Sequence, residues 1–262
     1  FVQGHRLATT RQWPENRIAF GGDYNPEQWP REVWVDDLRL MAQAGVSFVT
    51  LGVFSWSWLE PSKGEYSFDW LDDIMDLLGE HGIAVDLATA TATPPPWLTS
   101  AYPEILPVDR EGHTLWPGSR QSWCPSSPLY REFALALTER LASRYHDHPA
   151  LAMWHVSIEY ACHNLPCYCN TCAVAFRRWL EQRHGTLEAL NDAWGTAFWS
   201  QRYTSWDDIL PPRITTTFAP VSTRSAAVTA VTSVERSSTP WAVATMSPVA
   251  ASCVAVVAGA SD

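Results

Sequence analysis

Three cysteines lie close together in the run Cys167-Tyr-Cys169-Asn-Thr-Cys172. Thiolates at this spacing can share one Zn²⁺, an ion that prefers four ligands arranged as a tetrahedron. The fourth ligand has to come from elsewhere in the chain, and the candidates are Cys124, Cys162 and His163. With four protein ligands the site would be closed, so the metal would join two loops and would not take part in a reaction. The alternative is a group of unrelated loop thiols.

A glutamate and an arginine are the other residues whose surroundings suggest chemistry. Glu159 ends an apolar run that begins at Leu151, which predicts a carboxylate at the C-terminal end of a strand. Glycoside hydrolysis needs such a carboxylic acid to protonate the leaving oxygen, together with a second carboxylate opposite it. Arg120 lies four residues before Cys124, and a guanidinium can form paired hydrogen bonds with sugar hydroxyls. The alternatives are an ordinary polar strand end and a surface arginine.

The elements that position these residues alternate between strands and helices. Apolar runs predict strands at residues 18–24, 47–53, 83–90 and 151–159. The segments between them carry one apolar stripe each, and the last stripe follows Ser127-Pro128, a typical N-cap and first helical position. Apolar strands that alternate with one-sided helices indicate parallel βαβ units, which occur in doubly wound sheets and in (β/α)8 barrels. No glycine-rich phosphate motif follows the first strands and the loops are long, which favours an α/β fold of the (β/α)8 barrel type.

The composition changes near residue 215. Residues 221–262 are mostly Ala, Val, Ser and Thr, and contain no Leu, Ile, Lys or Asn. We therefore expect residues 1–214 to form the barrel part, and residues 215–262 to be a low-complexity tail that is not a domain. The tail is either an unstructured linker or an out-of-frame translation, and the second is favoured because a barrel still needs four more strands at that point.

Bulk composition excludes several classes of partner. The net charge of −10 disfavours nucleic acid, which needs a basic surface. The 15 tryptophans suit stacking on sugar rings, although for any one of them a place in the core is the favoured alternative. Residues 1–10 show no secretory signal, and the apolar run at residues 250–260 is too short to span a bilayer. Six cysteines without an export signal indicate the cytoplasm, where thiols stay reduced.

Several separate motifs, in order, resemble family 42 of the glycoside hydrolases. The resemblance runs from about residue 15 to about residue 212. It rests on Phe20-Gly-Gly-Asp-Tyr-Asn-Pro-Glu-Gln-Trp29, Phe54-Ser-Trp-Ser-Trp-Leu-Glu-Pro61, Gly118-Ser-Arg-Gln121, Trp154-His-Val-Ser-x-Glu-Tyr160 and the Cys-His-Asn-x-Pro-Cys-Tyr-Cys-x-x-Cys run that ends at Cys172.

The resemblance implies a retaining β-galactosidase that acts on terminal β-D-galactose, with only about the first half of its (β/α)8 barrel in this chain. Glu159 would be the acid/base and Arg120 would contact the galactose. The structural zinc would bind Cys124, Cys167, Cys169 and Cys172, which favours Cys124 over Cys162 as the fourth ligand. The family also suggests a homotrimer.

Two departures from the family pattern affect the expected activity. Ile158 stands where the family has Asn, a residue that should hydrogen-bond the sugar 2-hydroxyl. The family's nucleophile, a Glu at the end of the seventh strand, has no counterpart, because neither Glu235 nor Asp262 lies in a strand-like context. The alternative function is therefore a truncated, catalytically inactive zinc-binding fragment.

Overall fold

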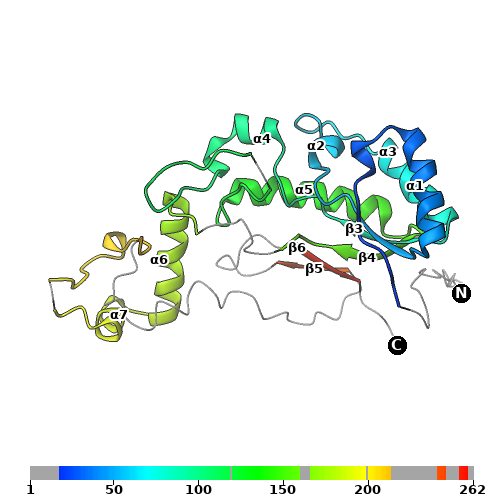
Figure 1. Cartoon of the computed structure of the whole chain (residues 1–262). Coiled ribbons are helices and arrows are strands. Elements are labelled where there is room, and N and C mark those ends of the chain that lie inside the picture. The colour runs from blue at the N-terminus through cyan, green and yellow to red at the C-terminus, as the bar shows by residue number, and fades with distance from the viewer. Residues whose placement is uncertain are drawn as a thin grey trace, which may run out of the picture.

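A parallel sheet of four strands organises the chain. The computed structural model describes residues 18–118, 120–159, 166–198 and 200–213, and the backbone of Trp241–Thr245 and Val254–Ala258. The sheet order is β1 (Asp23–Tyr24), β2 (Phe48–Leu51), β3 (Ala84–Ala88) and β4 (Leu151–His155), and each neighbouring pair is parallel (Figure 1). Because strand order follows chain order, the sheet has the arrangement of successive β/α units expected for part of a (β/α)8 barrel.

Helices connect the strands. They are α1 (Arg31–Ala44), α2 (Trp56–Leu59), α3 (Asp69–Glu80), α4 (Pro96–Ala101), α5 (Pro128–Tyr145), α6 (Asn170–His184) and α7 (Leu187–Trp194), with 3₁₀ turns η1 (Pro26–Gln28), η2 (Pro103–Ile105) and η3 (Trp206–Asp208). Gly45 ends α1 in a left-handed conformation, with φ 75°. Ser127 caps α5, since its hydroxyl accepts a hydrogen bond from the Tyr130 amide. Within the described ranges no helix combines the length and the apolarity that crossing a bilayer requires.

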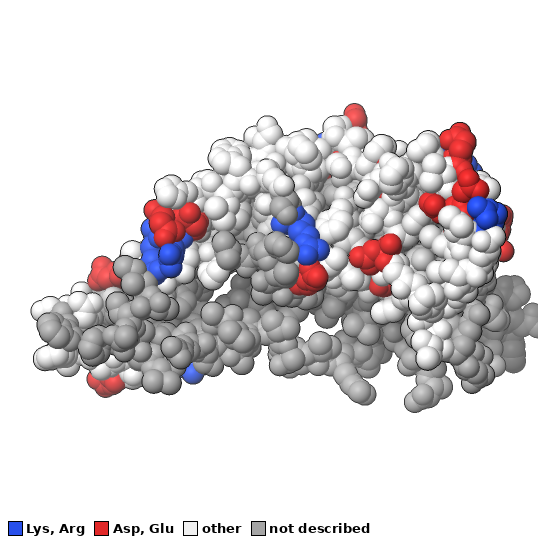
Figure 2. Space-filling view, viewed as in Figure 1, with Lys and Arg blue, Asp and Glu red and all other residues white. Residues whose placement is uncertain are grey.

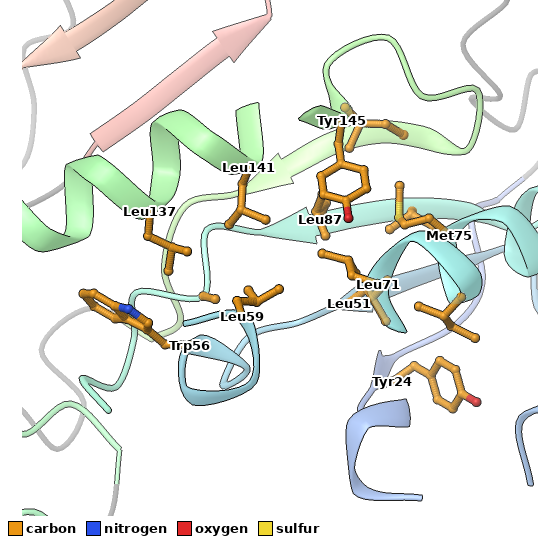
Figure 3. Close-up of a cluster of buried hydrophobic side chains, with 14 of the residues drawn as sticks. Tyr24, Leu51, Trp56, Leu59, Leu71, Met75, Leu87, Leu137, Leu141 and Tyr145 are labelled. Carbon is orange, nitrogen blue, oxygen red and sulfur yellow. The ribbon is translucent and has the colours of Figure 1, made fainter. Parts of the chain in front are cut away.

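The main core lies between the sheet and the helices that cover one of its faces (Figures 1 and 3). Alternate strand residues point into it, as the two-residue period of a strand requires. Helices α3 and α5 supply the opposite side from residues three or four positions apart. The fully buried contributors include Leu51, Val85, Leu87, Leu71, Ile74, Met75, Leu78, Leu137 and Leu141.

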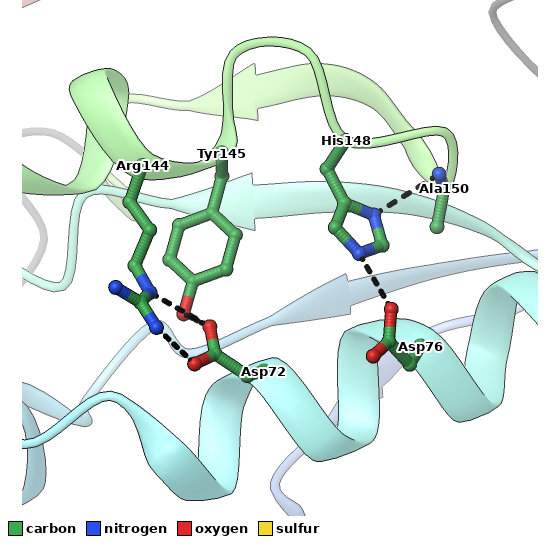
Figure 4. A network of polar contacts seen from close by, with 6 residues as sticks. All are labelled: Asp72, Asp76, Arg144, Tyr145, His148 and Ala150. Atoms are coloured by element: carbon green, nitrogen blue, oxygen red, sulfur yellow. Dashed lines mark hydrogen bonds and ion pairs between the residues drawn. The ribbon is translucent and has the colours of Figure 1, made fainter.

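A polar contact fixes α3 against α5 at the edge of this core (Figure 4). The Asp72 carboxylate accepts hydrogen bonds from the Arg144 guanidinium, at 2.8 Å from Nε, and from the Tyr145 hydroxyl at 2.7 Å. One turn further along α3, Asp76 lies 3.2 Å from His148 Nε2. Partial burial raises the pKa of Asp72, but the hydrogen bonds from Arg144 and Tyr145 outweigh it and hold that pKa below its ordinary value.

The opposite face of the sheet carries an acid–base pair made of a buried aspartate and a partly buried histidine. On β3, Asp86 alternates with the core residues Val85 and Leu87, so its side chain points away from the helices. Asp86 Oδ2 lies 3.1 Å from His155 Nδ1 and accepts a hydrogen bond from the Thr50 hydroxyl at 3.2 Å. The hydrogen bond to Asp86 raises the pKa of His155, and the charges of Asp86 and Asp23 add to this effect against the cost of burial.

Three expectations about the elements require correction. The ladder of β1 has two residues instead of seven, although Phe20 and Gly22 still accept backbone hydrogen bonds from Ser47 and Thr50. The predicted loop after β3 contains α4 and η2. Strand β4 ends at His155, so Glu159 lies in the loop beyond it.

Ten residues of the expected tail form two short strands. Strands β5 (Trp241–Thr245) and β6 (Val254–Ala258) pair antiparallel in a sheet of their own. The out-of-frame origin of the tail stays a prediction.

We predict that the Asp86–His155 pair makes the stability of the chain depend on pH. The folded state raises the pKa of His155 above its unfolded value, so the stabilisation is complete below the unfolded value and is lost as pH rises through the folded one. Between about pH 6 and about pH 9, the free energy of unfolding should fall more in the wild-type chain than in His155→Gln. Urea unfolding measures this difference. The exposed His81→Gln is the control, and an equal fall in wild type and His155→Gln would contradict the prediction.

Candidate active site and metal centre

The structure brings Glu159 and Arg120 together. Glu159 lies four residues beyond the end of β4, and its carboxylate forms an ion pair with the guanidinium of Arg120. The Glu159 side chain is 49% exposed and that of Arg120 is 27% exposed, so both groups are accessible to a ligand. The pair therefore lies at the C-terminal end of the parallel strands, where (β/α)8 enzymes have their active sites.

The backbone at Glu159 is unusual for a non-glycine residue, because its φ is 45°. The expected strand end would have placed this residue in extended conformation. Beyond His155 the backbone is held by a side chain, since the Thr89 hydroxyl donates to the Val156 carbonyl at 2.7 Å. The carboxylate is thus presented by a turn, which explains why the strand prediction misplaced its backbone.

The part of the loop after β3 that carries Arg120 is fastened to the first residues of the same loop. The Trp123 indole donates to the Ala92 carbonyl at 3.2 Å, and the Gln121 amide donates to the same carbonyl at 3.1 Å. Trp123 also stacks on Tyr130 of α5, with ring centroids 4.5 Å apart. These contacts fix the backbone directly after Arg120 in the chain.

Ile158 points its side chain onto apolar neighbours. It packs against Val53, Ala88 and Ala92, which come from the C-terminal ends of β2 and β3 and the loop after β3. The position next to the acid is therefore occupied by a side chain that neither donates nor accepts a hydrogen bond.

Beside this pair, four cysteines form one cluster. The sulfur atoms of Cys124, Cys167, Cys169 and Cys172 all lie within 4.8 Å of one another. Cys124 Sγ is 3.5 Å from Cys169 Sγ and 3.4 Å from Cys172 Sγ. The cluster joins the loop after β3 to the start of α6, and Cys162 and His163, the other candidates for a fourth ligand, lie outside the described residues.

Backbone amides surround the sulfur atoms. The Val108 amide donates to Cys167 Sγ at 3.3 Å, and the Cys172 amide donates to Cys169 Sγ at 3.4 Å. Hydrogen bonding to Cys124 lowers the pKa of Cys167 to about 7 and also lowers that of Cys169, while the hydrogen bonds to Cys167, Cys169 and Cys172 raise the pKa of Cys124. The hydrogen bonds within the cluster therefore favour the thiolate form of Cys167 and Cys169.

The donor set fits Zn²⁺. Sulfur atoms bound to one zinc at about 2.3 Å lie a little under 4 Å apart in a tetrahedron, close to the separations found here. Thiolate ligands select zinc over the hard cations that prefer oxygen. Three of the four cysteines are buried and all four are free of disulfides.

Sequence comparison matches residues 23–226 of the chain to the profile of glycoside hydrolase family 42, described as β-galactosidase. The chain belongs to family 42 of the glycoside hydrolases. The match ends inside the region expected to be a tail, twelve residues beyond position 214.

Curated family 42 relatives are similar over most of this chain but are much longer. β-Galactosidase BbgII of Bifidobacterium bifidum is 53% identical over 207 residues, which cover 77% of this chain and 30% of the relative. A β-galactosidase of an Arthrobacter species is 58% identical over 197 residues, covering 75% of this chain and 28% of the relative. The chain thus spans less than a third of the length of these relatives.

Solved family 42 structures agree with the fold. The β-galactosidase of Bacillus circulans sp. alkalophilus superposes with a TM-score of 0.72 at 47% identity, over 74% of this chain and 28% of that chain. The enzyme of the psychrophilic Marinomonas ef1 gives a TM-score of 0.74 at 43% identity, over 78% of this chain and 31% of that chain. The four β/α units are accordingly a partial (β/α)8 barrel.

Gln121 and Thr89 are residues of this family 42 site whose roles the sequence did not predict. Gln121 is buried and contacts the backbone that carries Glu159, and Thr89 joins the ends of β3 and β4. The position of Gln121 directly after Arg120 in a recognised motif was the available signal. Its role was not assigned because it depends on a contact with a residue 38 positions away.

We predict about one Zn²⁺ per chain in protein purified without chelators. Cys124→Ser should lose most of it, because a tetrahedral site that loses one of four thiolates binds the ion far more weakly. Metal analysis of the wild type, Cys124→Ser and Cys162→Ser measures this, and the last variant should retain the ion. A content below about half an equivalent, unchanged by Cys124→Ser, would refute the metal centre.

Proposed function

We propose that the chain carries the galactoside-binding and proton-donating part of a retaining β-galactosidase, with Glu159 as the acid/base. The substrate class is a β-galactoside with a terminal, non-reducing β-D-galactose. The observation that carries this proposal is the ion pair between Glu159 and Arg120 at the C-terminal end of the sheet. Named β-galactosidases of the same family support the choice of sugar.

The reaction takes two steps at one carbon. In the first, the protonated Glu159 carboxyl donates to the glycosidic oxygen while a second carboxylate attacks the anomeric carbon. In the second, the Glu159 carboxylate takes a proton from the water that releases galactose. Arg120 would hydrogen-bond sugar hydroxyls and keep the Glu159 carboxylate oriented. The second carboxylate, expected at about 5–5.5 Å from the first, is assigned to no residue of this chain.

Zinc, in this proposal, is structural. Cys124, Cys167, Cys169 and Cys172 would fill all four coordination positions, which leaves none for water or substrate. The ion would hold the Arg120 loop beside the segment that follows Glu159. Free thiols of this kind suit the reducing cytoplasm. The family suggests a homotrimer. Neither a membrane nor nucleic acid is proposed as a partner.

A second candidate function is a catalytically inactive, zinc-binding fragment. It is favoured by Ile158, which stands next to the acid and can neither donate nor accept a hydrogen bond. In this case the chain would bind a galactoside at Arg120 and Glu159 without turning it over. The two candidates share the acid and differ in the nucleophile.

An external nucleophile tests the role of Glu159, and turnover without that nucleophile separates the two candidates. We predict that the chain releases the phenol of an aryl β-galactoside only when azide is added. Azide attacks the anomeric carbon, the bond to the aryl oxygen breaks, Glu159 gives its proton to that oxygen, and a galactosyl azide forms. Glu159→Gln should slow this release about 10²- to 10⁴-fold for a weakly acidic phenol, and much less for a strongly acidic one that leaves without protonation.

The exposed Glu188→Gln of α7 is the matched control and should change nothing. Release that is equally fast in Glu159→Gln and wild type would contradict the role of Glu159. Turnover without azide that disappears in Glu159→Gln would overturn the inactive-fragment candidate.

We also predict that Ile158→Asn raises the azide-dependent rate. A hydrogen bond to the 2-hydroxyl that strengthens in the transition state contributes roughly 2–4 kcal/mol, equivalent to about 30- to 1,000-fold. The gain should vanish with a 2-deoxygalactoside, which lacks the hydroxyl. An equal gain on both substrates would show that the effect comes from repacking against Val53, Ala88 and Ala92.

A further inference from the structure

Gln121 connects the Arg120 loop directly to the backbone that carries Glu159. Its side chain is only 4% exposed. The carboxamide nitrogen donates to the carbonyl oxygen of Ile158 and lies 3.3 Å from that of Glu159. One buried side chain thus contacts two successive carbonyl groups on either side of the Cα of the acid.

Gln121 is itself held by the first residues of the loop that follows β3. Its backbone amide donates to the Ala92 carbonyl at 3.1 Å and lies 3.3 Å from the Thr93 hydroxyl. Ala92 packs in the small apolar cluster with Val53 and Ala88. The carboxamide therefore extends from a fixed backbone, so its hydrogen bonds can restrain the backbone of Ile158 and Glu159.

Two of these residues occupy a backbone conformation that side chains disfavour. The φ angle is 62° at Gln121 and 45° at Glu159. Such a conformation costs about 1–3 kcal/mol and persists only where the surrounding structure holds it. The ladder of β4 ends at His155, so strand pairing does not reach Glu159. The hydrogen bonds from Gln121 restrain the backbone at Glu159, which strand pairing does not hold.

We propose that Gln121 is a positioning residue, which holds the Ile158–Glu159 backbone in its turn and so keeps the Glu159 carboxylate beside Arg120. The inference rests on the proposed function, in which Glu159 is the acid/base. Gln121 acts through the backbone and does not touch the substrate. Arg120 orients the carboxylate of Glu159, while the adjacent Gln121 fixes the main chain from which that carboxylate extends.

The test follows the Glu159 carboxyl carbon by NMR in the full chain labelled with ¹³C at glutamate side chains. The signal is assigned by its absence in Glu159→Gln, and its position without the ion pair is defined by Arg120→Ala. Gln121→Met removes the donors at similar volume. The matched control is Gln43→Met, at an exposed position of α1.

In Gln121→Met the Glu159 signal should move toward its position in Arg120→Ala, whereas Gln43→Met should leave it unchanged. A role of Gln121 in general stability would not move this one signal while the other glutamate signals stay in place. A Glu159 signal that Gln121→Met leaves at the wild-type position overturns the proposal. It is also overturned if Arg120→Ala fails to move the signal, because the ion pair to be maintained is then absent.

A second measurement uses the wild-type chain alone, in case Gln121→Met does not fold. The Gln121 carboxamide protons, assigned through bonds from its backbone, should exchange with water roughly tenfold more slowly than those of Gln43, because both bonds must open first. Equal exchange rates overturn the proposal. Neither measurement needs a galactoside, so loss of galactoside chemistry with these signals intact would refute the proposed function and leave the positioning role standing.

Discussion

Contact between two loops, one after β3 and one after β4, underlies every functional feature of this chain. Cys124 from the first loop lies within 3.5 Å of Cys169, at the end of the second loop, and of Cys172, in the first turn of α6, although more than forty residues separate them in sequence. The same two loops meet again where Arg120 pairs with Glu159. Because the segments are far apart in the chain, bringing them together costs loop-closure entropy, which sulfur ligation of a shared ion would offset.

The core explains why this contact can form at one defined place. Helices α3 and α5 pack on the covered face of the sheet and are fixed to each other through Asp72 and Arg144. The last residues of β3 and β4, Ala88 and His155, pair with each other, so the two loops begin side by side. On the face shown in Figure 2, the described basic side chains lie beside acidic ones, and further acidic groups lie without a basic neighbour.

Local signals in the sequence were sufficient for the elements that obey local rules. Ser127 before Pro128 predicted the start of α5. The family resemblance grouped Cys124 with the three clustered cysteines, and it assigned Arg120 and Glu159 to the same sugar. These residues were predictable because each belongs to a motif whose spacing is itself informative.

Features that depend on tertiary contact were not predictable in the same way. The apolar run before Glu159 continues past His155, so periodicity alone extended β4 four residues too far. The turn at Glu159 is stabilised by Gln121 and Thr89, which reach it from a different strand and loop. Nothing in the sequence near Glu159 encodes that restraint, since its donors come from a different part of the chain.

X-ray absorption at the zinc edge of the purified chain tests the central contact most directly. If both loops bind one ion, the spectrum will show four sulfur neighbours at about 2.3 Å and no nitrogen or oxygen neighbour, and Cys124→Ser will replace one sulfur with a lighter atom. A wild-type spectrum with three or fewer sulfur neighbours, unchanged in Cys124→Ser, would show that the loop after β3 is not bound to the loop after β4.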